Sequence, residues 1–215
     1  VTQAGLLTPA QVKHGMWIIF FLAALCGLYL ASLRGWTVIW IGVAAIISAI
    51  AYTGGPFPLG YYGLGDLFVF IFFGLAAVAG TYFVQVGSVS AVVWWMSVPI
   101  GLIITAILVV NNLRDIENDR TAGKHTLAVR IGAQATKVEY VLFLAIAYLL
   151  LPALILFKLL PITSLLAWLS LPLAYKATRV VLTQTGRPLN TALAGTGQTA
   201  LAYSVLFWVG MLLVK

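Results

Sequence analysis

Acidic residues are scarce in this chain, and most of them lie together. Three of its five acids, Asp115, Glu117 and Asp119, fall in the run NNLRDIENDRTAGKHTLAVRIG, which begins at Asn111. If the preceding apolar helix continues through this run, residues four apart share one face, so Asn111, Asp115 and Asp119 form a stripe and Glu117 points elsewhere. Two carboxylates in this relation repel each other, more strongly near a membrane. A divalent cation would offset the repulsion.

Basic residues follow the acidic stripe at once. Arg120, Lys124 and Arg130 would hold phosphate oxygens through charge-assisted hydrogen bonds. Mg²⁺ typically takes one or two carboxylates, some waters and substrate phosphates. The run therefore predicts a Mg²⁺–diphosphate site with Asp115 and Asp119 as metal ligands. A solvated loop with internal ion pairs accounts for the same residues, because D-x-x-x-D is a common pattern.

The composition indicates which elements position this cluster. The 215 residues are 62% hydrophobic and only 8% charged, whereas a soluble domain carries about 25% charged residues. A spanning helix needs about 20 apolar residues. We therefore expect an all-α integral membrane protein, a single transmembrane bundle over residues 1–215, with seven spans at about 16–33, 36–53, 67–84, 89–110, 140–157, 159–175 and 196–214.

The basic residues are distributed unequally between the connections. Arg34, Lys158 and Lys215 belong to one side of a seven-span chain, and the other side holds Lys13, Arg114, Arg120, Lys124, Arg130, Lys137, Lys176, Arg179 and Arg187. Cytoplasmic loops carry the excess of Lys and Arg, so the side with the acidic cluster is expected to face the cytoplasm or the equivalent stromal space. The net charge of +7 thus indicates topology, and we expect no nucleic-acid partner.

Longer motifs carry a family resemblance. The run from Asn111 to Gly132 closely resembles the second aspartate-rich motif of the UbiA superfamily of intramembrane aromatic prenyltransferases, in the form found in its 1,4-dihydroxy-2-naphthoate prenyltransferase branch. YTGGPFPLGYYGLGDLFVFIFFG, from Tyr52 to Gly74, resembles another cytoplasmic loop of that branch. GRPLNTALAGTGQTAL, from Gly186 to Leu201, resembles the last loop and helix of its phototroph members. The resemblance covers essentially the whole chain.

The resemblance implies a reaction and a set of site residues. A prenyl group, with a weak preference for phytyl, would pass from an isoprenoid diphosphate to the carboxylate-bearing carbon of 1,4-dihydroxy-2-naphthoate, with loss of CO₂, in menaquinone or phylloquinone biosynthesis. The enzyme would lie in a bacterial inner or thylakoid-type membrane. Mg²⁺ would bind Asp115 and Asp119, and substrate would contact Asn111, Asn112, Arg114, Lys124 and Arg130.

The sequence also departs from the family pattern. The first aspartate-rich motif, an N-D-x-x-D run, is expected just upstream of Val1, and the family bundle has nine helices, so we expect residues 1–215 to represent helices three to nine. Some superfamily members carry Tyr-x-x-x-Lys in the loop that here spans Gly54–Asp66. This loop has no lysine, and Gly60 stands about where it would lie, which fits the naphthoate branch.

The loop before the third predicted span adds three candidates. Asp66 is either an N-cap, for which Asp is favoured, or a group that binds or deprotonates an acceptor hydroxyl. Tyr61 and Tyr62 beside it either face a cation or belong to the interfacial aromatic belt.

Three rival functions remain open. A sister prenyltransferase would act on homogentisate or chlorophyllide. A CDP-alcohol phosphotransferase would also use membrane aspartates with Mg²⁺, but it needs a further aspartate pair downstream of Asp119, and the sequence contains none. A transporter predicts ionisable groups at mid-span, and the seven predicted spans contain none.

Overall fold

The chain is an all-helical bundle in the computed structural model, which describes residues 2, 4–54 and 58–213. The helices are α1 (Pro9–Arg34), α2 (Trp36–Thr53), α3 (Gly65–Val69), α4 (Ala77–Val86), α5 (Ala91–Thr121), α6 (Leu127–Leu156), α7 (Leu171–Thr183) and α8 (Leu189–Leu212). A π-helical segment, Phe70–Ala76, joins α3 and α4 into one continuous helix, and a 3₁₀ segment, Ile162–Ser170, leads into α7. The described residues form no strand, and the predicted all-α fold is confirmed.

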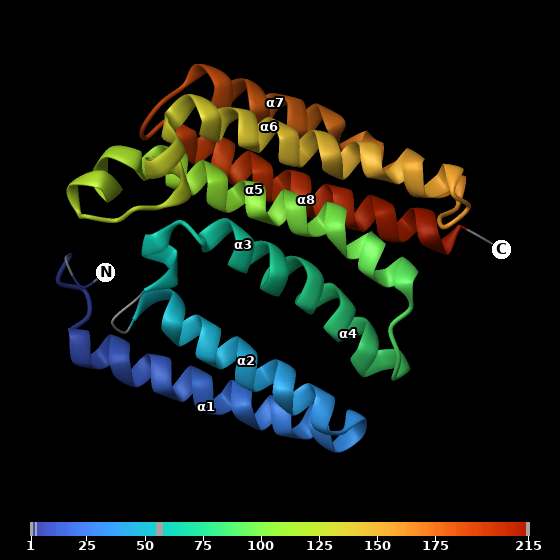
Figure 1. Cartoon of the computed structure of the whole chain (residues 1–215), viewed down its shortest axis with the longest axis horizontal. Coiled ribbons are helices and arrows are strands. Elements are labelled where there is room, and N and C mark those ends of the chain that lie inside the picture. The colour runs from blue at the N-terminus through green and yellow to red at the C-terminus, as the bar shows by residue number, and fades with distance from the viewer. Residues whose placement is uncertain (1, 3, 55–57, 214–215) are drawn as a thin grey trace.

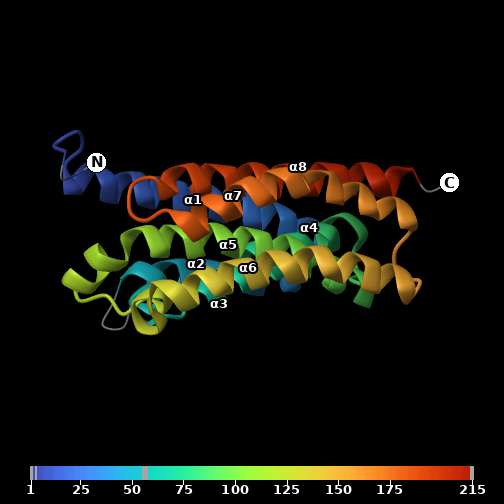
Figure 2. The ribbon, with the colours of Figure 1, turned by 90° about the horizontal axis from the view of Figure 1, so that it is seen from above.

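The helices run side by side along one axis in successive layers (Figure 1). The close-packed part consists of α5 to α8, whose buried side chains include Ile103, Tyr140, Leu151 and Tyr203. The continuous α3–α4 helix packs on α5, and the α1–α2 hairpin lies outside it, on the side away from α7. Figure 2 shows the same helices in a view turned by 90°.

The surface of the outer helices is strongly apolar. Of the side chains of α1 only Ala31 is buried, and large side chains such as Trp36 and Trp40 of α2 are mostly exposed. Such a surface is unfavourable in water and favourable in contact with lipid chains. Five of the described helices are long and apolar enough to cross a membrane: Pro9–Arg34, Gly65–Val86, Ala91–Thr121, Leu127–Leu156 and Ile162–Thr183.

The two remaining predicted spans are less clear in composition. The apolar part of α2, Trp36–Tyr52, is shorter than a typical span. α8 is long, but it is not among the five, since its first half is rich in Thr, Gly and Gln. Membrane crossing by α2 and α8 therefore stays a prediction.

Several helices extend beyond the predicted spans. α1 begins at Pro9 because Thr8 and Gln11 form a capping box, in which the Thr8 side chain accepts a hydrogen bond from the Gln11 amide. α5 continues to Thr121, and α7 continues to Thr183 with Lys176 and Arg179 exposed on its surface. Long basic side chains lie readily at a membrane surface, so they do not end a helix as a loop would.

The connections gather at the two ends of the bundle. The start of α1 lies at the same end as the links from α2 to α3, from α5 to α6 and from α7 to α8, whereas the links from α1 to α2, from α4 to α5 and from α6 to α7 lie at the other end, with the end of α8 (Figure 1). At that second end Arg34 donates hydrogen bonds to the carbonyl oxygens of Val84 and Gln85, both at 2.6 Å, and so ties the α1–α2 turn to the end of α4.

Candidate active site

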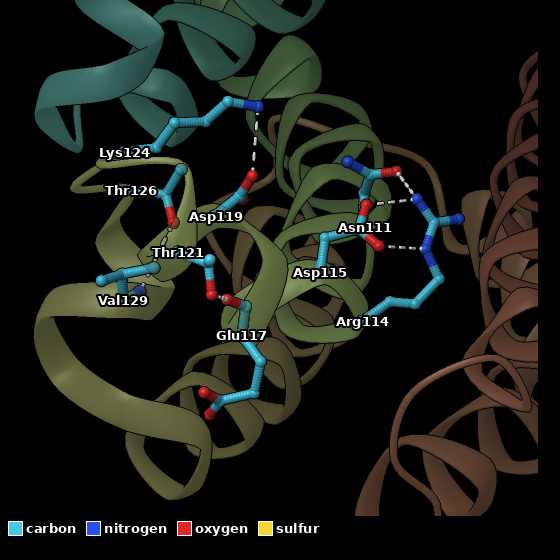
Figure 3. Close-up of polar contacts among 9 residues, drawn as sticks. All are labelled: Asn111, Arg114, Asp115, Glu117, Asp119, Thr121, Lys124, Thr126 and Val129. Atoms are coloured by element: carbon cyan, nitrogen blue, oxygen red, sulfur yellow. Dashed lines mark hydrogen bonds and ion pairs between the residues drawn. The ribbon is translucent and has the colours of Figure 1, made fainter. Parts of the chain in front are cut away.

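The acidic stripe lies on an extension of α5. This helix has 31 residues, and at 1.5 Å per residue it is about 46 Å long, against about 30 Å for the hydrocarbon core of a bilayer. Its last turns therefore project past the membrane interior. Because the helix is continuous through Thr121, Asp115 and Asp119 share a face, as the spacing predicts, and Glu117 points away and pairs with Arg120 (Figure 3).

Arg114 connects this stripe to α8. Its Nε donates a hydrogen bond to Oδ1 of Asp115 at 2.8 Å, and one Nη bonds the other carboxylate oxygen. The same guanidinium donates to the side-chain oxygens of Asn111, at 2.8 Å, and Asn190, at 2.7 Å. Arg114 thus orients the carboxylate of Asp115 and the side-chain amides of Asn111 and Asn190. Arg114 lies on α5 and Asn190 on α8, 76 residues apart in sequence.

Lys124 plays the matching part for Asp119. Its Nζ lies 3.1 Å from Oδ1 of Asp119, whose side chain is buried, and 5.0 Å from the centre of the Tyr61 ring. The hydrogen bond to Asp119 raises the pKa of Lys124, against the opposing effect of its partial burial. The ammonium is therefore firmly charged, and Tyr61 faces a cation, as one of its two interpretations predicted.

The two site loops are joined by backbone contacts. The His125 amide donates to the carbonyl of Tyr61 at 2.8 Å, and Arg130 Nε donates to the carbonyl of His125 at 3.0 Å. Gly63 (φ 75°) fits beneath this contact, since a Cβ there would lie 3.2 Å from Arg130 Nε. The hydrogen bond from His125 to Tyr61 therefore joins the two loops, and Arg130, whose Nε is engaged by His125 of its own segment, packs against Gly63 of the other loop.

Asp66 is not the N-cap of its helix. α3 begins at Gly65 with Leu64 in the cap position, and no side chain caps it. Asp66 stands one residue further in, where its charge still favours the helix dipole. Its side chain is 7% exposed, and within the described residues its Oδ1 has no hydrogen-bond partner. A buried, unpartnered carboxylate oxygen calls for an explanation, and a ligand hydroxyl provides one.

The remaining sequence candidates are placed as follows. Asn112 is buried against the bundle rather than on the stripe, and Tyr62 is exposed on the same 3₁₀ turn as Tyr61, Leu59–Tyr62. Three polar residues near the site were not among the predicted site residues. Tyr52 and Glu139 both lie close enough to Asp66 to interact with its charge, and Asn190 accepts a hydrogen bond from Arg114.

The donor set suits a metal ion of the magnesium type. No group of three or more His, Cys, Asp or Glu side chains comes together within the described ranges. Two carboxylates on one helix face, Asp115 and Asp119, match an ion that keeps several waters and takes its other ligands from phosphates. Arg114 and Lys124 compensate these two charges in the structure, so a cation is not required to hold the stripe together.

An apolar pocket opens beside the polar cluster. It has a volume of about 580 Å³ and lies between α1, α2 and α3 with its π-helical extension. Aromatic side chains from all three elements line it, including Phe20, Tyr52, Phe68 and Phe72. Tyr52 belongs to the last turn of α2, so this end of the pocket meets the loops that carry Tyr61 and Lys124.

Known proteins resemble the chain over most of its length. The model of the UbiA prenyltransferase family matches residues 1–194. The 1,4-dihydroxy-2-naphthoate octaprenyltransferase of Haemophilus influenzae is 35% identical over 98% of this chain and 71% of its own length. The Mycobacterium tuberculosis protein of the same name is 39% identical over 93% and 68%. The 2-carboxy-1,4-naphthoquinone phytyltransferase of Synechocystis is 35% identical over 75% and 53%.

Proposed function

Since this chain belongs to the UbiA prenyltransferase family, we propose that it transfers a prenyl group from an isoprenoid diphosphate to 1,4-dihydroxy-2-naphthoate. The similar proteins carry names that describe a naphthoate acceptor and a prenyl or phytyl group. The product is the demethylated precursor of a menaquinone or phylloquinone. The chain is an integral membrane protein, as its apolar helices indicate.

One observation carries this proposal: a charged cluster and an apolar pocket meet at one end of the bundle. A prenyl diphosphate has the same two parts, a highly charged head and a hydrocarbon tail. The head fits the cluster of Asp115, Asp119 and Lys124, and the tail fits the pocket of about 580 Å³ between α1, α2 and α3. Pockets for small ligands typically have volumes of about 300–1,000 Å³.

Asp115 and Asp119 are the residues that would hold Mg²⁺. Bound there, the ion would neutralise the diphosphate and weaken its bond to the allylic carbon. Diphosphate oxygens would then replace Asp119 as the partner of Lys124, because the ammonium is charged and lies within reach of the loop surface. Arg114 keeps Asp115 oriented through its contacts with Asn111 and Asn190.

The reaction then needs no proton from solvent. The bond between the allylic carbon and the diphosphate oxygen breaks, and both electrons leave with the diphosphate. The naphthoate ring carbon that bears the carboxylate forms the new carbon–carbon bond. The bond to the carboxylate breaks, its electrons restore the aromatic ring, and CO₂ leaves. Asp66 would accept a hydrogen bond from a ring hydroxyl, which makes the ring more electron-rich.

We place the site on the cytoplasmic or stromal side of the membrane. Nine of the twelve Lys and Arg residues, Lys124 and Arg114 among them, belong to the links at one end of the bundle or to the helix ends that adjoin those links. Loops rich in Lys and Arg remain on that side during insertion. Diphosphate and naphthoate are both charged, so they would reach the site from water while the prenyl tail enters from the lipid.

Product analysis tests the proposal. Membranes containing the protein are given dihydroxynaphthoate and a mixture of prenyl diphosphates, including phytyl diphosphate, and lipids are analysed by mass spectrometry. We expect a prenylated naphthol lacking the carboxylate, formed only with divalent metal present and absent with Asp119→Asn. Prenylation of homogentisate but not of the naphthoate would contradict the proposal. The tail length of the product identifies the donor.

A further inference from the structure

Tyr52 stands at the boundary between the two halves of the proposed site. It lies in the last turn of α2, and its ring lines the apolar pocket together with Phe20 and Phe68. On its other side it is close enough to Asp66 and Lys124 to interact with both charges. Tyr52 is therefore a pocket residue that also interacts with the charges of the polar cluster.

Two glycines fix the position of this ring. A Cβ at Gly60 would lie 2.9 Å from Cε1 and 3.0 Å from Cζ of Tyr52, and a Cβ at Gly65 would lie 2.9 Å from its hydroxyl oxygen. Side-chain carbons essentially never approach so closely, so any other residue at either position would push the ring aside. The loop from Gly60 to Gly65 therefore packs directly against Tyr52. Gly60, which stands where some superfamily members have a lysine, permits this close contact.

The hydroxyl of Tyr52 also differs from those of the core tyrosines. Tyr140, Tyr148 and Tyr203 each make a hydrogen bond inside the α5–α8 bundle. In the described part of the chain the Tyr52 hydroxyl makes none, although its residue is half-buried. Among the described residues, the Tyr52 hydroxyl thus forms no hydrogen bond of the kind that Tyr140, Tyr148 and Tyr203 form inside the bundle.

The proposed reaction locates the reacting carbon at this boundary. With the diphosphate among Asp119 and Lys124 and the tail in the pocket, the first carbon of the tail lies between them, where Tyr52 is. As the carbon–oxygen bond breaks, that carbon becomes positive. The face of an aromatic ring attracts a cation, and the attraction is strongest where water is excluded.

We propose that the ring of Tyr52 is a catalytic group that faces the allylic carbon and stabilises its positive charge, an inference that rests on the proposed function. The ring forms no covalent bond, and its hydroxyl keeps its proton. The positive charge on the allylic carbon is neutralised when the naphthoate ring supplies the electron pair of the new bond. Tyr61 does not meet this requirement, because its ring faces Lys124 at 5.0 Å and is not part of the pocket.

The electron density of the ring provides the test. In the full-length protein, Tyr52→Phe should keep turnover within about threefold, because the ring is retained. Replacing that phenylalanine with mono-, di- and trifluoro-phenylalanine changes the shape little and weakens cation binding stepwise. We expect kcat to fall stepwise, by about tenfold or more over the series, while KM for the diphosphate changes little, since the effect arises in the transition state.

Two controls separate this role from packing. The same fluorinated series at Tyr29, which is 66% exposed on α1, should leave kcat unchanged. Tyr61→Leu should raise KM for the diphosphate through Lys124 rather than lower kcat. A flat series at position 52 in an active enzyme would overturn the assignment of Tyr52 alone. Failure of the unaltered protein to prenylate the naphthoate would overturn the proposed function and this inference with it.

Discussion

The two carboxylates of the stripe are held by different cations, and this division sets what each substitution does. Asp115 is fixed by Arg114, which is itself anchored to Asn111 and Asn190, whereas Asp119 contacts Lys124 on a loop. The Asp115 side is therefore rigid. The Asp119 side is built to exchange partners when a diphosphate arrives, because Lys124 can turn to it.

The first prediction concerns these acids. Asp115→Asn and Asp119→Asn should each lower kcat/KM by about 100-fold or more, because each removes a charged oxygen from the transition-state environment. Glu117→Gln is the matched control, since its side chain is 75% exposed and pairs only with exposed Arg120 among the residues described. Kinetics at several Mg²⁺ concentrations measure the effect. Equal losses at all three positions would mean that the run acts through its total charge alone.

The second prediction concerns Asp66. A structural carboxylate would lose its hydrogen bonds on replacement, whereas Oδ1 of Asp66 is buried with no partner among the described residues, which is already a cost to folding. Asp66→Asn should therefore leave the melting temperature in detergent unchanged or slightly higher, while kcat falls and KM for the diphosphate stays near its original value. A lower melting temperature with unaltered kcat would show that Asp66 supports the helix and takes no part in the reaction.

Part of this site could be predicted from the sequence and part could not. The stripe of Asn111, Asp115 and Asp119 follows from helix periodicity, which local sequence contains. The contact of Arg114 with Asn190 depends on how α5 packs on α8, and the role of Tyr52 depends on a loop closing over it. Neither feature can be recognised from the sequence immediately around these residues. The N-cap interpretation of Asp66 was wrong by two positions, because Leu64 holds the cap position and the helix begins at Gly65.

At the scale of the helices, charge proved a poor marker of where a helix ends. The predicted first and third spans lie within helices that extend further at both ends, and α5 continues past the predicted end of the fourth span, because a backbone hydrogen-bonded to itself tolerates charged side chains outside the lipid. The predicted loop of 29 residues is consequently a short link, residues 122–126, followed by a short first part of α6 that ends where the helix breaks at Gly132 (φ 82°). This shortness holds Lys124 close to the stripe.

The third prediction concerns the close contact between the π-helical segment, Phe70–Ala76, and α5. The π-helical segment crosses α5 at Gly74 and Gly101, where a Cβ on Gly74 would lie 2.5 Å from the Cα of Gly101. Because the obstacle is backbone, Gly74→Ala must push the helices apart, at a cost of about 1–3 kcal/mol. The melting temperature in detergent should fall. Gly80→Ala on α4 is the control, since a Cβ there meets nothing within 4 Å, and alanine favours a helix.

At the scale of the whole molecule, the bundle divides its charges between its two ends. Arg34 and Lys158 are the described Lys and Arg residues at the end with the short turns, and Arg34 is engaged by the carbonyls of Val84 and Gln85. The other end carries the stripe, the basic loops and Tyr52, which lines the apolar pocket. A single orientation in the membrane therefore decides which compartment supplies the substrates.

The last prediction tests that orientation. Single cysteines are introduced at Ala122 and Thr185, both exposed in links at the site end, and at Ser88, exposed in the link between α4 and α5. The background carries Cys26→Ser, since Cys26 is the only cysteine and is exposed. The excess of Lys and Arg predicts that a membrane-impermeant thiol reagent reaches residues 122 and 185 only from the cytoplasmic or stromal side, and residue 88 only from the opposite side. Labelling of 122 and 185 from opposite sides would mean that the helices between them cross an odd number of times. In that case α6 or α7 would not span, and the hydrogen bond from Arg114 to Asn190 could not form at one membrane surface.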